Sequence, residues 1–271
     1  MDGKGVILRF SVKEDTIYNL FFEDKNIIYP WGIEAGDSNS FFSLEQGAGY
    51  RYEEEKSDLD ITENKYSYRK IICMHDGKWG LDGCDTIDGS KMVRYAKIKC
   101  LENTFFLDFV MRFRFKKKYF EKAYIADRII THKNANVYYQ YQVNHVTLRG
   151  ELEARIDVID YIVPEKMKPY MYVRDFGDEW VVHARMLPTD AEKKVIKLCT
   201  QWYKTKPLPE PINNILCRNE KIYEYLKYHN EKEPYQSFFL KKLCPNAFPL
   251  IMVQEGKELM WKVEVMITSG Q

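Results

Sequence analysis

The stretch from His145 to Val158 alternates polar and apolar residues along its whole length, and this alternation constrains the fold more than any other feature. Side chains of a strand point to opposite faces with a period of two, whereas a helix repeats every 3.6 residues. The pattern therefore predicts a strand with one apolar and one polar face. The polar face would carry His145, Thr147, Arg149, Glu151, Glu153, Arg155 and Asp157.

Alternation of the same kind recurs through the first two thirds of the chain, in segments 6–13, 105–116, 136–144 and 180–186. Short turn sequences containing Asp-Gly or Asn separate several of these segments, which favours antiparallel neighbours because parallel strands need a long crossover. In segment 105–116, Arg112 and Arg114 should lie opposite an apolar face. That face, expected in the core, consists of Phe105, Leu107, Phe109, Met111, Phe113 and Phe115.

The period changes after Leu187. Thr189 followed by Glu192 is a capping-box signature, with Thr189 as the cap. Apolar residues then recur at helical spacing, at Ala191, Val195, Leu198 and Trp202. The pattern predicts a helix from about Asp190 to Lys204.

Two shorter helices are predicted beyond it, one capped by Asn219 and one from Pro234 to Leu243, with the Pro-rich segment 206–211 as a connector. The predicted fold class is α+β, a large curved antiparallel β-sheet of about 8–10 strands with two or three helices in the C-terminal third. We expect a single domain over 1–271. Its parts would be a β-rich region 1–187, a helical insertion at about 188–245, and C-terminal strands 250–268 that rejoin the sheet.

The region from Trp31 to Asp60 differs from the strands, because it holds four glycines and a patch of acidic residues. These features predict long loops with at most one short element. Long loops inside a compact domain are often lids or binding loops.

Composition narrows the class of protein. The 271 residues are 45% hydrophobic, enough for a large core, and the formal net charge of +1 gives no global argument for a polyanionic partner. High counts of tyrosine and phenylalanine favour a sheet-rich fold. The chain shows no signal peptide and no apolar run long enough to span a membrane, so we expect a cytoplasmic protein.

Candidate site residues lie on the polar strand faces. If the strands around Arg112, around His145 and around His183 share a sheet, their polar sides would form one surface able to bind phosphate or to transfer protons. The candidate catalytic residues are His145, Glu151, Glu153 and His183. The candidate ligand-binding residues are Arg112, Arg114, Lys116, Arg149 and Arg185. The alternative is an ordinary solvent face on which charges pair across strands.

Two other motifs bear on function. The basic aromatic run 111–122 combines groups that hold single-stranded nucleic acids, although Phe113 and Phe115 fall on the apolar face. The Asp-Gly cluster 75–89 lacks the spacing of a calcium loop and indicates turns. The six cysteines and five histidines show no metal-ligand spacing, so we assign no metal site, and no motif identifies a cofactor.

These observations lead to one main functional hypothesis and two alternatives. The main hypothesis is a soluble polyanion- or nucleic-acid-binding protein that processes its ligand on the polar sheet face, with nucleic acid or another phosphate-bearing molecule as partner and no membrane association. The first alternative is an enzyme or carrier for a small molecule bound in the concavity of the sheet. The second is a protein-interaction module. The oligomeric state is left open.

Overall fold

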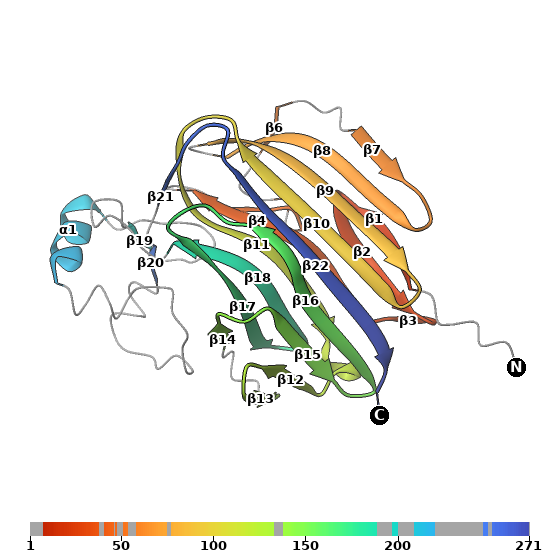
Figure 1. Ribbon diagram of the computed structural model, residues 1–271. Helices are drawn as coiled ribbons and strands as arrows, with labels where there is room; N and C mark the ends of the chain where they lie inside the picture. The colour runs from red at the N-terminus through yellow and green to blue at the C-terminus, as the bar shows by residue number, and fades with distance from the viewer. Residues whose placement is uncertain are drawn as a thin grey trace, which may run out of the picture.

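The computed structural model describes residues 8–37, 41–45, 47, 51–53, 58–74, 77–132, 138–188, 197–199, 209–219, 246–248 and 251–270. Nearly all of this part of the chain is strand, arranged in two large antiparallel sheets. Figure 1 shows one sheet lying in front of the other.

The first sheet, at the back in Figure 1, has ten strands. Its main path runs in the order β1 (Arg9–Lys13), β2 (Thr16–Phe22), β4 (Ile28–Asp37), β11 (Thr104–Lys116), β18 (Glu179–Pro188), β17 (Met167–Phe176) and β14 (Tyr138–Tyr141). Three short strands pair beside this path, namely β3 (Lys25–Asn26), β5 (Phe41–Ser43) and β21 (Ile251–Val253).

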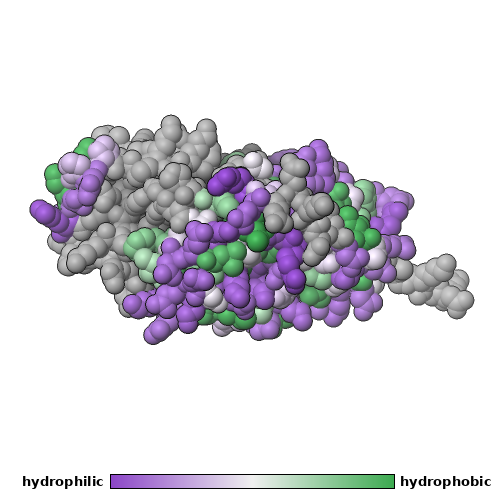
Figure 2. Space-filling view, turned by 90° about the horizontal axis from the view of Figure 1, so that it is seen from above, coloured by the Kyte–Doolittle hydropathy of each residue, from purple (hydrophilic) through white to green (hydrophobic). Residues whose placement is uncertain are grey.

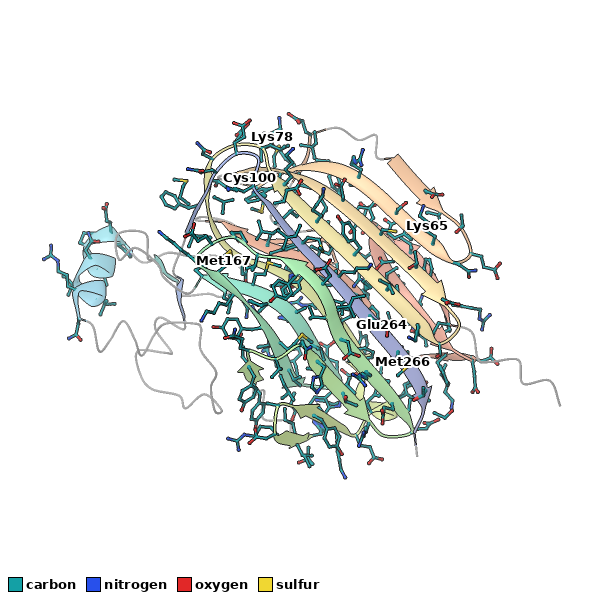
Figure 3. The ribbon with its side chains drawn as sticks, viewed as in Figure 1. Lys65, Lys78, Cys100, Met167, Glu264 and Met266 are labelled. Atoms are coloured by element: carbon teal, nitrogen blue, oxygen red, sulfur yellow. The ribbon has the colours of Figure 1, made fainter. Side chains whose placement is uncertain are left out.

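The second sheet also has ten strands. Its path runs in the order β13 (Arg128–Thr131), β12 (Lys122–Ile125), β15 (His145–Arg149), β16 (Leu152–Ile162), β22 (Glu258–Ser269), β10 (Lys91–Cys100), β9 (Lys78–Asp88), β8 (Lys65–Cys73) and β6 (Arg51–Tyr52), with β7 (Asp58–Ile61) paired to β8. The last strand of the chain, β22, thus lies in the middle of this sheet between β16 and β10. Figure 3 marks Glu264 and Met266 on β22, where both side chains are partly exposed.

The core fills the space between the two sheets. The alternate residues Phe109, Met111, Phe113 and Phe115 of β11 are buried in it, as the period-two pattern predicts, with Arg112 and Arg114 on the other face. Phe105 is only partly buried, and the side chain of Leu107 lies outside the described residues. Facing residues of β22 complete this part of the core, at Leu259, Trp261, Val263, Val265 and Ile267.

The predicted fold class is wrong, because the described residues form a mainly-β sandwich of two sheets instead of one sheet with several helices. Only one α-helix, α1 (Glu210–Arg218), occurs among them, beside a single 3-10 turn η1 (Lys117–Tyr119). The prediction of a helix from Asp190 to Lys204 is wrong for the part that the structure describes. Residues 197–199 form the strand β19 (Lys197–Cys199), which pairs with β20 (Asn246–Phe248). Thr189 and the helix predicted from Pro234 lie outside the described residues.

Helix α1 begins inside the segment predicted as a Pro-rich connector. Pro209 precedes the helix and Pro211 stands in its first turn, where proline costs no hydrogen bond because the first amides of a helix have no partner within it. Figure 1 shows α1, β19 and β20 to one side of the sandwich. No helix among the described residues is long and apolar enough to cross a membrane.

The alternating stretch that predicts one strand is a hairpin. Strands β15 and β16 pair with Arg149 opposite Glu153, and the chain turns at Gly150 and Glu151. A Cβ atom at Gly150 would lie 2.7 Å from the backbone nitrogen of Glu121, so this turn packs too closely against the chain for a side chain. Cross-strand partners share a face of the sheet, so the polar residues of β15 and of β16 lie on the same face although the chain turns between the strands.

The region predicted as long loops also contains strands. Trp31, Ile33 and Ala35 of β4 are buried in the core and alternate with Gly32 and Glu34.

The surface seen in Figure 2 is mostly hydrophilic, with hydrophobic residues in small separate patches.

Replacing Phe109 by alanine should lower the free energy of unfolding by about 3 to 5 kcal/mol, because the ring is fully buried between the sheets. Chemical denaturation of the two proteins measures this difference. Ile129→Ala serves as a control, since Ile129 is 64% exposed and its truncation should change stability by less than about 0.5 kcal/mol. Similar losses for both variants would contradict the placement of β11.

Candidate functional site

The outer face of the first sheet, turned away from the core, carries a row of polar side chains. Arg112 of β11 is opposite Gly32 of β4 on one side and His183 of β18 on the other. His183 is in turn opposite Tyr172 of β17, and Tyr172 is opposite Gln140 of β14. Because cross-strand partners share a face, Arg112, His183, Tyr172 and Gln140 follow one another across four strands.

This outer face is unusual because it is buried although it is charged. Along β18, both the core residues and the outer-face residues Val181, His183, Arg185 and Leu187 are buried. Its neighbours Glu34, Asp108 and Gln140 are also almost fully buried. Charged groups removed from water require close partners, so the contacts of these side chains decide what the face can do.

Arg112 is the centre of the cluster. Its Nη1 forms ion pairs with Glu34 and with Oε1 of Glu45, the latter at 2.6 Å, and its Nε donates a hydrogen bond to Nε2 of His183 at 3.1 Å. Glu45 fits above the sheet because position 32 is glycine, where a Cβ atom would lie 1.6 Å from Oε2 of Glu45. One arginine therefore gathers two carboxyl groups and an imidazole.

The two carboxyl groups lie side by side on one guanidinium. Burial raises the pKa of Glu34 well above its ordinary value, the positive charge of Arg112 opposes this rise, and the negative charge of Glu45 adds to it. A carboxyl group with a raised pKa holds its proton more readily, so Glu34 is a candidate proton donor.

His183 is held as a neutral imidazole. Burial lowers its pKa well below the ordinary value, and the positive charges of Arg112, Arg185 and Arg174 lower it further. Its ring stacks on Tyr172 at 4.6 Å between centroids. Because an arginine can only donate, Nε2 must accept and the ring proton belongs on Nδ1. Nδ1 has no hydrogen-bond partner among the described residues, so it can donate to a ligand.

Arg185 and Asp108 form a second buried pair beside the cluster. Nη2 of Arg185 lies 2.5 Å from Oδ2 of Asp108, and both side chains are fully buried. Burial raises the pKa of Asp108, while Arg185 lowers it. The guanidinium of Arg185 also lies over the ring of Tyr172 at 5.9 Å. Arg112 and Arg185, the two charges that lower the pKa of His183 most, are thus matched by carboxylates.

Farther along β11, Arg114 and Lys116 have partners of their own. Arg114 donates to both carboxylate oxygens of Glu179 at 2.7 and 3.1 Å. Nζ of Lys116 donates to the backbone oxygen of Asn26 at 3.1 Å, and burial lowers the pKa of this lysine. Arg112, Arg114 and Lys116, three basic residues of the run that resembled a nucleic-acid-binding segment, are therefore engaged within the protein.

The remaining candidate residues lie on the second sheet, away from this cluster. His145 and Arg149 belong to β15, Glu153 belongs to β16, and Glu151 lies in the turn between them. Arg149 pairs with Glu153 at 2.7 Å and Glu151 with Lys25 at 2.5 Å, in both cases near solvent. The structure therefore brings together Arg112, His183 and Arg185, and separates them from the residues of the β15–β16 hairpin.

The carboxylates that complete the cluster, Glu34, Glu45 and Asp108, were not among the site residues predicted from the sequence. The signal for Glu34 was present, because Gly32, Glu34 and Gly36 alternate with the apolar residues of β4. For Glu45 no local pattern exists, since it reaches the site from a turn. Among the described residues, no group of three or more His, Cys, Asp or Glu is arranged to hold a metal ion.

Fold and site together define a large antiparallel β-sandwich with a buried acid–base cluster on the outer face of one sheet. Among solved structures, the chain is similar to a galactose mutarotase related enzyme from Lactobacillus acidophilus, with a TM-score of 0.53 and 9% identity over 99% of this chain and 96% of that one. It is also similar to a putative aldose 1-epimerase from Escherichia coli K12, with a TM-score of 0.50 and 7% identity over 98% of this chain and 97% of that one. No family model and no curated protein matches the sequence.

At these identities the likeness establishes the fold, a galactose mutarotase-like β-sandwich. It also corrects the main functional hypothesis. The interpretation as a polyanion- or nucleic-acid-binding protein is wrong, because the fold is that of the mutarotase-like structures. Two of the arginines that motivated it, Arg112 and Arg185, are also buried against carboxylates. The alternative of a small-molecule protein agrees better with these findings.

Stability should fall below pH 6.5 because of His183. The pKa of His183 is depressed in the folded state. As the pH drops below the ordinary value of 6.5, the unfolded chain therefore binds a proton at His183 that the folded protein does not bind. Above pH 6.5 the stabilisation that comes from neutral His183 is fully present. As the pH falls below this value, the free energy of unfolding decreases by up to about 1.4 kcal/mol per pH unit. Denaturation of the wild type and His183→Asn from pH 7.5 to 5 should show a flatter profile for the variant, and parallel profiles would contradict the assignment.

Proposed function

We propose that the protein is a sugar-processing enzyme that binds a neutral aldose at the Arg112 cluster and interconverts its anomers. The observation that carries the proposal is the carboxyl pair of Glu34 and Glu45 beside the neutral imidazole of His183. The fold shared with a galactose mutarotase related enzyme and a putative aldose 1-epimerase supports this class of substrate.

Anomer exchange needs both an acid and a base. The base removes the proton of the anomeric hydroxyl, the acid protonates the ring oxygen, and the bond between C1 and the ring oxygen breaks to give the open aldehyde. Rotation about the bond between C1 and C2, followed by the reverse proton transfers, closes the other anomer. In the proposal, the neighbouring carboxyl groups of Glu34 and Glu45 supply the acid and the base.

Arg112 and His183 complete the proposed site. Arg112 holds both carboxyl groups together, and its positive charge opposes the rise of the Glu34 pKa. The Nδ1–H of His183 is available to donate a hydrogen bond to a sugar oxygen, and stacking on Tyr172 fixes its direction. Because these side chains are buried, a ligand reaches them only after local opening of the protein.

The charge balance of the cluster favours an uncharged ligand. Arg112 is matched by Glu34 and Glu45, and Arg185 is matched by Asp108. A phosphate brought next to these pairs would meet their carboxylates, with no surplus of positive charge from the two arginines. Binding of a neutral sugar should accordingly change little with salt concentration.

We also infer a cytoplasmic location. Cys73, Cys84 and Cys100 are free thiols, and burial raises the pKa of Cys84 and Cys100. Cysteines that are not disulfide-bonded are typical of proteins in a reducing compartment. The raised pKa keeps these two thiols protonated and poorly reactive.

The activity can be measured by polarimetry with freshly dissolved α-D-galactose or α-D-glucose. The wild type should speed the approach to the equilibrium rotation above the rate of buffer alone. Glu34→Gln, which keeps the size of the side chain but cannot accept a proton, should lower kcat by about 10² to 10⁴-fold, the usual effect of losing an acid–base group.

Arg149→Ala is the matched control, because this exposed arginine lies on the opposite sheet and should leave the rate unchanged. A wild type no faster than buffer with both sugars would contradict the proposed reaction. Equal loss in Glu34→Gln and Arg149→Ala would contradict the proposed site.

A further inference from the structure

A charged pair lies inside the core, where the two sheets meet. Arg94 of β10 and Asp85 of β9 are opposite each other, with Nε of Arg94 donating to Oδ1 of Asp85 at 2.7 Å. Each side chain is only 3% exposed. The guanidinium also lies over the rings of Trp31 and Phe113, at 5.5 and 5.6 Å. Arg94 thus projects from the second sheet into the aromatic core of the first.

The guanidinium ends at the backbone of the candidate site. Nη1 of Arg94 donates to the backbone oxygen of Arg112 at 3.5 Å. This contact falls where the pairing of β11 with β4 is irregular, because the register shifts between Arg112 and Arg114. The neighbouring carbonyl of Arg114 is bound in a similar way, by Nε1 of Trp31 at 3.1 Å. Core side chains therefore hold β11 where its ladder is interrupted.

Arg112 connects the core face of β11 with its outer face. The backbone oxygen of Arg112 is held from the core, while its side chain reaches the outer face and binds Glu34, Glu45 and His183. A small rotation of the backbone at Arg112 would be multiplied at the end of its long side chain. The hydrogen bond from Arg112 to His183 depends on the direction in which the Arg112 side chain leaves the backbone.

We propose that Arg94, held by Asp85, is a positioning residue that fixes the backbone of Arg112 and thereby the hydrogen bond from Arg112 to His183. The kinetic consequence rests on the proposed function, whereas the effect on His183 rests on the contacts alone. A buried ion pair is costly to desolvate and an apolar pair of similar volume often replaces it without loss of stability, so its role can be separated from packing.

The test variant is Asp85→Val combined with Arg94→Met, which fills the site with apolar groups and leaves no unpaired charge. Lys70→Met combined with Asp15→Asn is the matched control, since asparagine tolerates the left-handed backbone of position 15, where φ is 61°. Lys70 and Asp15 form another largely shielded pair, 9% and 11% exposed, and Lys70 lies over the ring of Tyr52, so none of these partners belongs to β11.

The primary measurement is the tautomer of His183 in protein with ¹⁵N-labelled histidine, with its signal identified by its loss in His183→Asn. In the wild type and the control variant, Nε2 should be unprotonated and Nδ1 protonated. In the test variant, the Nε2–H tautomer should appear beside it, because the donor from Arg112 is no longer held in place. The kcat for sugar anomer exchange should also fall by about tenfold to a hundredfold, with a smaller change in KM.

A folded test variant that keeps the wild-type tautomer of His183 would overturn the proposal, and so would an equal change in the control. If the test variant does not fold, Asp85→Asn takes its place, because it keeps the size of the side chain and weakens only its hold on Arg94. A wild type without sugar activity would refute the proposed function, and the His183 comparison would still decide the role of Arg94.

Discussion

Burial of both faces of the central strands in the first sheet is the constraint on which the rest of the molecule depends. Strands β11 and β18 place aromatic and aliphatic residues in the core and charged residues on a second buried face. An unpaired charge there would be very costly, so each charge must meet an opposite charge or a hydrogen-bond partner. The cluster around Arg112 is the arrangement that satisfies this requirement.

Antiparallel pairing converts this requirement into geometry. Strands distant in sequence place one residue each in the row from Gly32 to Gln140, so the register of four strand pairs sets the spacing of the site. Rigid strands hold such groups more accurately than loops do. The irregular pairing beside Arg112 is the weak point of this scaffold, and it is where side chains from the core contact the backbone.

Period-two alternation predicts the faces of β11 and β18 and picks out Arg112, His183 and Arg185. It cannot predict which strands share a sheet, because parity along a strand carries no information about its neighbours. For the same reason the β15–β16 hairpin resembles a single strand, since Arg149 and Glu153 fall on the same face on either side of the turn. Glu45 escaped prediction because a turn delivers it to a site formed by other segments.

The glycine at position 32 determines how this cluster can change by mutation. Its missing side chain is the space that Glu45 occupies, so the second carboxyl group depends on a hydrogen atom at position 32. A single methyl group there would displace the Glu45 carboxyl group and leave Glu34 alone with Arg112. One nucleotide change at this codon would thus be enough to remove one of the two carboxyl groups from the cluster.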